Sequence, residues 1–117
     1  MKIRIKGNSL RLRLSKTEVD KIVHHGEVVD NSQIGNKILT YKLIQGEFPE
    51  LCADFDGDSI VIKSPESYVQ KWNTDDRVGF DGYDTNGLYI LIEKDFQCLT
   101  HRNEDESDLY PNPNLAH

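Results

Sequence analysis

Two stretches near the start of the chain alternate between polar and apolar residues. Residues 2–6 read Lys-Ile-Arg-Ile-Lys, and residues 10–14 read Leu-Arg-Leu-Arg-Leu. This period of two is typical of strands with one face toward a core and the other toward solvent. Gly7-Asn8-Ser9 lies between them and suits a tight turn. The pattern predicts a hairpin whose outward side chains are all cations: Lys2, Arg4, Lys6, Arg11 and Arg13.

After this hairpin the hydrophobic period changes to that of a helix. Apolar residues recur at helical spacing between residues 19 and 23. Ser15 has the residue type of a helix N-cap, and Glu18 three residues later completes a capping-box pattern. Gly26 is of the type that commonly follows the last turn of a helix. We therefore predict a helix over residues 16–25.

Strand-like patterns return after this helix, with one interruption. Apolar alternation and short apolar runs predict strands over residues 27–31, 37–45, 51–55, 59–63, 77–80 and 88–93. Asp56-Gly57 is the strongest hairpin-turn signal in the chain. Ser64 followed by Pro65 has the form of a helix start and predicts a second helix over residues 65–72.

This order of elements predicts one α+β domain over residues 1–100. Its core is expected to be a single, mainly antiparallel sheet of about six to eight strands with two short helices on one face, and 117 residues suffice for one such domain. Residues 101–117 are expected to form an extended acidic tail, because Pro111 and Pro113 exclude a helix. We find no internal repeat long enough to indicate a solenoid.

The chain shows no sign of membrane insertion or export. No apolar stretch approaches the ~20 residues that span a bilayer. The first six residues alternate charge with isoleucine and so lack the apolar core of a secretory signal. We expect a soluble, cytoplasmic protein with no membrane partner.

Charge is distributed unevenly along the chain. The net charge is -6, yet residues 1–26 alone sum to +5 and the remaining residues to -11. A separation of this size indicates either a functional basic face or a basic hairpin neutralised by the rest of the chain. The tail offers four counter-charges, in cis or across a homodimer: Glu104, Asp105, Glu106 and Asp108.

Candidate catalytic or metal chemistry is limited to one short segment. Cys52 and Cys98 lie far apart and form no CxxC pair, so we expect reduced thiols. Cys98 and His101 offer two metal ligands where zinc needs about four, and they also have the residue types of a nucleophile and its base. We predict no catalytic residue, no metal and no cofactor, and keep an enzyme or metal site around Cys98 and His101 as an alternative.

Two resemblances add to these patterns. Across nearly its whole length the chain resembles a family of small uncharacterised bacterial proteins, known only as a domain of unknown function. The recognisable segments are residues 2–14, 93–99 and 104–108. That resemblance implies no activity, cofactor or catalytic residue. Residues 6–19, with Gly26-Glu27-Val28-Val29, are similar to swapped-hairpin antitoxins and transition-state regulators.

The second resemblance implies a function. Swapped-hairpin proteins form intertwined dimers and bind DNA through basic residues of their first strands, which correspond here to Arg4, Lys6, Arg11 and Arg13. The residues themselves favour a non-enzymatic binding module that uses the basic hairpin to hold a protein or another anionic ligand. A DNA-binding homodimer is the alternative that the resemblance implies.

Overall fold

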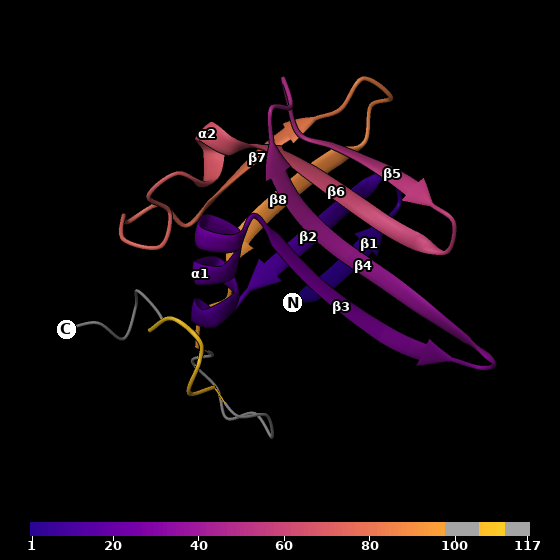
Figure 1. Cartoon of the computed structure of the whole chain (residues 1–117), viewed down its shortest axis with the longest axis horizontal. Coiled ribbons are helices and arrows are strands. Elements are labelled where there is room, and N and C mark those ends of the chain that lie inside the picture. The colour runs from indigo at the N-terminus through magenta and orange to yellow at the C-terminus, as the bar shows by residue number, and fades with distance from the viewer. Residues whose placement is uncertain (98–105, 112–117) are drawn as a thin grey trace.

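The structure is a computed structural model that describes residues 1–97 and 106–111, and within them eight strands form two four-stranded sheets (Figure 1). The strands are β1 (Lys2–Lys6), β2 (Ser9–Leu14), β3 (Glu27–Ile34), β4 (Lys37–Gly46), β5 (Cys52–Asp56), β6 (Ser59–Pro65), β7 (Gly79–Tyr83) and β8 (Tyr89–Lys94). The helices are α1 (Lys16–His25) and α2 (Glu66–Val69). The first sheet has the order β1-β2-β8-β7, and the second has the order β3-β4-β6-β5.

The predicted fold class, one mainly antiparallel sheet, is wrong. Both sheets are mixed, because β2 pairs with β8 in parallel and β4 pairs with β6 in parallel. Each sheet therefore consists of two antiparallel hairpins joined along a parallel seam. The α1 segment carries the chain from β2 in the first sheet to β3 in the second sheet. Local patterns mark the hairpins, but they do not say which hairpins become neighbours.

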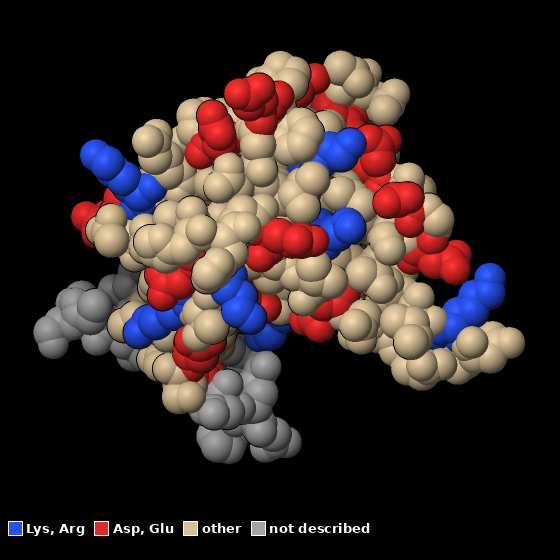
Figure 2. All heavy atoms as spheres, in the orientation of Figure 1, with Lys and Arg blue, Asp and Glu red and all other residues tan. Residues whose placement is uncertain are grey.

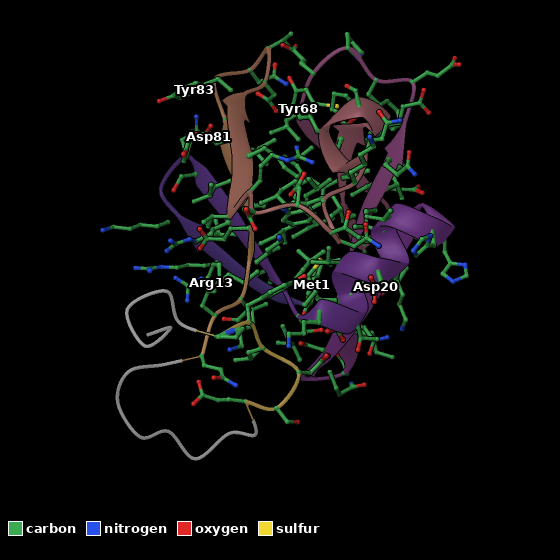
Figure 3. All side chains as sticks on the ribbon, turned by 90° about the vertical axis from the view of Figure 1, so that its left-hand side faces the viewer. Met1, Arg13, Asp20, Tyr68, Asp81 and Tyr83 are labelled. Carbon is green, nitrogen blue, oxygen red and sulfur yellow. The ribbon has the colours of Figure 1, made fainter. Side chains whose placement is uncertain are left out.

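The inward side chains of the two sheets form one core. Leu12 pairs with Ile92 in the first sheet and Leu43 with Ile62 in the second, and all four side chains are fully buried. Both helices lie on the same side of the molecule (Figures 1 and 3). They leave the outer surface of the first sheet uncovered, and Figure 3 shows this surface on the left.

The two helices match their predictions to different degrees. For α1 both capping-box bonds form: Glu18 N donates to Ser15 Oγ over 3.3 Å, and Ser15 N donates to Glu18 Oε1 over 2.9 Å. Gly26 ends α1 with a φ of 78°, which favours glycine. The second predicted helix, over residues 65–72, shrinks to the four residues of α2. Turns follow it, and in them the buried Trp72 donates its indole N–H to the carbonyl of Arg77.

The second half of the chain repeats the architecture of the first. Each half has the order hairpin, helix, hairpin, and each sheet takes one hairpin from each half. The registers also repeat: Lys2 pairs with Arg13, and the residues 50 positions later, Cys52 and Lys63, pair likewise. The repeat is therefore not a solenoid but two interleaved copies of a unit of about 50 residues.

Part of the C-terminal segment packs against the domain. Leu109 is buried, and Tyr110 bridges to Phe96, with their ring centroids 5.7 Å apart. Tyr110 N donates to the carbonyl of Asp95, and Lys16 N donates to the carbonyl of Asp108. Residues 106–111 are therefore attached to both α1 and the end of β8. The predicted domain boundary at residue 100 lies in the undescribed stretch 98–105 and stays a prediction.

Candidate functional site

The outer surface of the first sheet is a regular grid of side chains. Strand register aligns them in three rows across β1, β2, β8 and β7: Lys2, Arg13, Glu93 and Gly79; Arg4, Arg11, Leu91 and Asp81; Lys6, Ser9, Tyr89 and Tyr83. We call the five cations of β1 and β2 the basic face: Lys2, Arg4, Lys6, Arg11 and Arg13. In Figure 3, Arg13, Asp81 and Tyr83 lie along this side of the molecule.

Carboxylates from the end of β8 partly neutralise the basic face. Arg13 Nε donates to Glu93 Oε1 over 3.0 Å. Arg11 Nε lies 2.7 Å from the same oxygen but has no aligned hydrogen bond, so its attraction to Glu93 is electrostatic. Lys2 Nζ pairs with Asp95 Oδ2 at 2.9 Å. Three of the five cations are therefore held in place from β8 and the residue that follows it.

Arg4 and Lys6 complete the basic face. Both are exposed, and neither has a carboxylate within ion-pair distance among residues 1–97 and 106–111. Two open hollows lie beside them, of about 170 Å³ and about 160 Å³. Arg4 and Arg11 line both hollows, while Tyr89 and Leu91 give the larger one an apolar wall. Charged side chains thus lie next to apolar surface.

Two tyrosines stand beside the basic face, on β7 and β8. The ring centroids of Tyr83 and Tyr89 are 5.2 Å apart. Tyr89 donates its hydroxyl to Asp81 Oδ2 over 2.7 Å, and this hydrogen bond, followed by burial, raises the pKa of Tyr89. Tyr83 is 68% exposed, so most of its ring is open to a partner.

The amino group of Met1 fixes the start of β1 against the domain. It is buried, donates to Glu18 Oε2, and lies 3.1 Å from Asp30 Oδ2. Burial raises the pKa of Asp30, but the hydrogen bonds from the Met1 amino group and from Asn31 N outweigh it and lower the pKa overall. Met1 therefore links the basic hairpin to α1 and β3.

Asp108, one of the four predicted tail counter-charges, is bonded to the start of α1. Its Oδ1 accepts hydrogen bonds from Thr17 N and Thr17 Oγ1 at the start of α1. The carbonyl of Glu106 accepts from Gln97 Nε2. Glu104 and Asp105 lie outside the described residues, so neutralisation by the tail stays a prediction.

Sequence reasoning missed Glu93 and Asp95 as partners of the basic face. Glu93 shares strand parity with Tyr89 and Leu91, so its outward direction could be read from the sequence. Its place beside Arg13 could not, because that depends on the parallel pairing of β2 with β8.

We expect Asp108→Asn to lower the melting temperature at neutral pH by a few degrees. Burial raises the pKa of Asp108, but hydrogen bonds from Ser15 and Thr17 bring it below 3.8. A carboxyl whose folded pKa lies below its unfolded value stabilises the fold above the unfolded value, and this contribution is lost as pH falls through the folded pKa. The difference between the variant and the parent should therefore shrink below about pH 3.8.

Thermal melts followed by circular dichroism at neutral and acid pH measure this difference. Glu47→Gln removes a carboxylate from an exposed loop and serves as the control. A deficit for Asp108→Asn that stays constant across this pH range would contradict the assignment.

The alternative site around Cys98 and His101 lies outside the described residues and stays a prediction. Within the described part of the chain, no group of three or more His, Cys, Asp or Glu residues is arranged to hold a metal ion. Burial is the main reason that the pKa of Cys52 is raised. Among those same residues, no helix has both the length and the apolar character needed to cross a membrane.

Comparisons with known proteins identify the family of the chain. Residues 1–114 match a family model described as "Family of unknown function (DUF7009)", and the chain belongs to that family. A search of curated proteins and a search of solved structures found no match. The expected bacterial origin and the local resemblance to swapped-hairpin regulators stay predictions.

Proposed function

We propose that this protein is a non-enzymatic binding module that holds an anionic partner on its basic face. All five cations project from one surface of one hairpin, and the register places Arg4 directly opposite Arg11. Like charges at directly opposed positions destabilise a strand pair. Glu93 offsets part of this repulsion at Arg11, and a partner carrying negative charge would offset the rest at Arg4.

The main support for this proposal is a difference in charge between two otherwise similar hairpins, β1–β2 and β5–β6. The hairpin β5–β6 has the same strand lengths to within one residue, the same pairing register and the same kind of turn as β1–β2. At the five positions equivalent to the basic face, 50 residues later, it has Cys52, Asp54, Asp56, Val61 and Lys63. The charge at these positions changes from +5 to -1, so this type of hairpin folds without a row of cations.

The two outer faces of the molecule also differ. Figure 2 shows the face of the second sheet, where Lys and Arg side chains lie among Asp and Glu. The net charge of -6 opposes the approach of a polyanion at long range. Binding must therefore depend on short-range contacts with the basic face, and it should weaken as salt is added.

We expect Arg4→Ala combined with Lys6→Ala to lower the affinity for labelled heparin, used as a generic polyanion, by about tenfold or more. The two substitutions remove the two cations of the basic face that have no carboxylate partner among the described residues. Fluorescence anisotropy at low salt measures the affinity, and a salt titration measures the electrostatic contribution.

The control variant is Lys37→Ala combined with Lys42→Ala, on β4 of the second sheet. It changes the net charge by the same amount, but on the opposite sheet. Equal losses in the two variants would show that overall charge decides binding, and no binding by the parent protein would refute the proposal.

Two further statements from the sequence remain predictions. The DNA-binding homodimer rests on the local resemblance alone. The cytoplasmic location rests on the sequence pattern alone.

A further inference from the structure

We infer that the anionic partner is a single-stranded nucleic acid, with its phosphates on the basic face and its bases stacked on Tyr83 and Tyr89. This inference rests on the proposed function and adds the chemical class of the partner. Proteins that bind single strands combine a cationic track for the backbone with aromatic side chains on which bases stack. The outer surface of the first sheet holds both features side by side.

Strand register places the cations and the aromatic rings within reach of one nucleotide. Lys6, Ser9, Tyr89 and Tyr83 form one row across the four strands. Neighbouring strands are ~4.8 Å apart, so about 10 Å separates the backbones at Lys6 and Tyr89. A lysine side chain and one sugar-phosphate unit can cover this distance.

The cations also repeat along the strand. Lys2, Arg4 and Lys6 occupy alternate positions of β1 and face the same side, which gives a spacing of ~6.7 Å. An extended nucleic-acid strand can place successive phosphates at similar intervals. A backbone that follows β1 and β2 would therefore meet a cation at each step.

Tyr89 is held in place by the sheet itself, and Tyr83 packs against it. The hydrogen bond from Tyr89 to Asp81 holds the Tyr89 ring in place, and Tyr83 packs against it with a centroid distance of 5.2 Å. Little side-chain entropy would then be lost when a base stacks there. Tyr83 is 68% exposed, so one of its faces is open.

The acidic groups on this surface set the direction of binding. Asp81 lies on β7 and Glu93 on β8, on the same side of the sheet as the tyrosines. Asp81 repels phosphates from this half of the surface, whereas Glu93 is already paired with Arg11 and Arg13. The end of the basic face that holds Arg4 and Lys6 is left for the backbone. The hollow of about 170 Å³ between the halves has Arg4 and Lys6 on one side and Tyr89 on the other. The cationic side of the hollow suits a phosphate, and the aromatic side suits a base.

The tyrosines favour a single strand over a duplex. In a duplex the base faces are stacked against each other and are closed to side chains on a sheet surface. The phosphates of a duplex could contact the cations, but its bases could not stack on the tyrosines. Affinity for duplex DNA would then depend on charge alone.

The experiment compares a labelled 12-nucleotide oligothymidine with a duplex of the same length, using fluorescence anisotropy of the full chain. We expect tighter binding of the single strand, and we expect Tyr83→Ala to weaken it about tenfold. Tyr83→Phe keeps the ring and should keep the affinity. Phe55→Ala removes an exposed aromatic ring from β5 of the second sheet and should have no effect.

Heparin separates the two proposals. Tyr83→Ala should leave heparin affinity unchanged, because heparin offers charge without bases. If heparin binds but oligothymidine does not, the single-strand inference fails and the proposed function stands. If neither binds, both fail. Unchanged oligothymidine affinity in Tyr83→Ala, or duplex binding as tight as single-strand binding, overturns the inference.

Discussion

Separated halves of the chain, residues 1–49 and 50–117, are expected to remain unfolded on their own and to fold when mixed. Each sheet takes one hairpin from each half, so an isolated half has two hairpins that lie in different sheets. Their parallel neighbours across the β2–β8 and β4–β6 seams are missing. An isolated two-stranded hairpin is marginally stable at best in water.

Circular dichroism and size-exclusion chromatography of the separate and mixed halves test this expectation. Mixing should restore the strand signal and a cooperative thermal transition. A matched pair cut within the β3–β4 turn, after Gly35, separates the same chain at another exposed loop and controls for the effect of cutting. A cooperative transition in either half as an isolated monomer would show that the sheets are not interdependent.

Trp72→Ala should reduce the free energy of unfolding by about 3–5 kcal/mol, the usual cost of removing a large core aromatic side chain. Trp72 is fully buried, and its ring meets Phe80 edge-on with a centroid distance of 5.0 Å. Total stabilities are typically about 5–15 kcal/mol. The loss is therefore a large share of what holds the fold together.

Urea unfolding followed by circular dichroism gives the difference in free energy. Trp72→Phe keeps a ring against Phe80 but gives up the indole hydrogen bond to the carbonyl of Arg77, so it should cost less than Trp72→Ala. Equal losses in both variants would mean that the hydrogen bond, rather than the packing of the ring, carries the contribution of Trp72.

Local signals in the sequence predicted the local structure well. The helix over residues 16–25 is correct because its cap residues, Ser15, Glu18 and Gly26, act through neighbours in the sequence. The turn at Gly7-Asn8 joins the antiparallel strands that the alternation indicates. The turn predicted at Asp56-Gly57 lies one residue later, at Gly57-Asp58, because Asp56 still pairs with Ser59. The second helix ends early because its sequence signal marks a start, whereas Trp72 is drawn into the core in a turn.

The arrangement of hairpins could not be read from the same signals. A strand that alternates polar and apolar residues shows which face is buried, but it does not specify its neighbour in the sheet. The outward direction of Arg4 and Arg11 was therefore predictable, whereas the contact of Arg13 with Glu93 was not. A comparison of Gly7-Asn8-Ser9-Leu10 with Gly57-Asp58-Ser59-Ile60 would have revealed the repeat.

In the first sheet, the parallel pairing of β2 with β8 joins strands from near the beginning and near the end of the domain. During synthesis on a ribosome, β2 emerges about 80 residues before β8. Until β8 emerges, one edge of β2 has no neighbouring strand, and the leucines of β2 lack part of their core contacts. The two strands can pair only when nearly the whole domain has left the exit tunnel. Contacts this distant in sequence slow folding and lengthen the time during which apolar strands are open to aggregation.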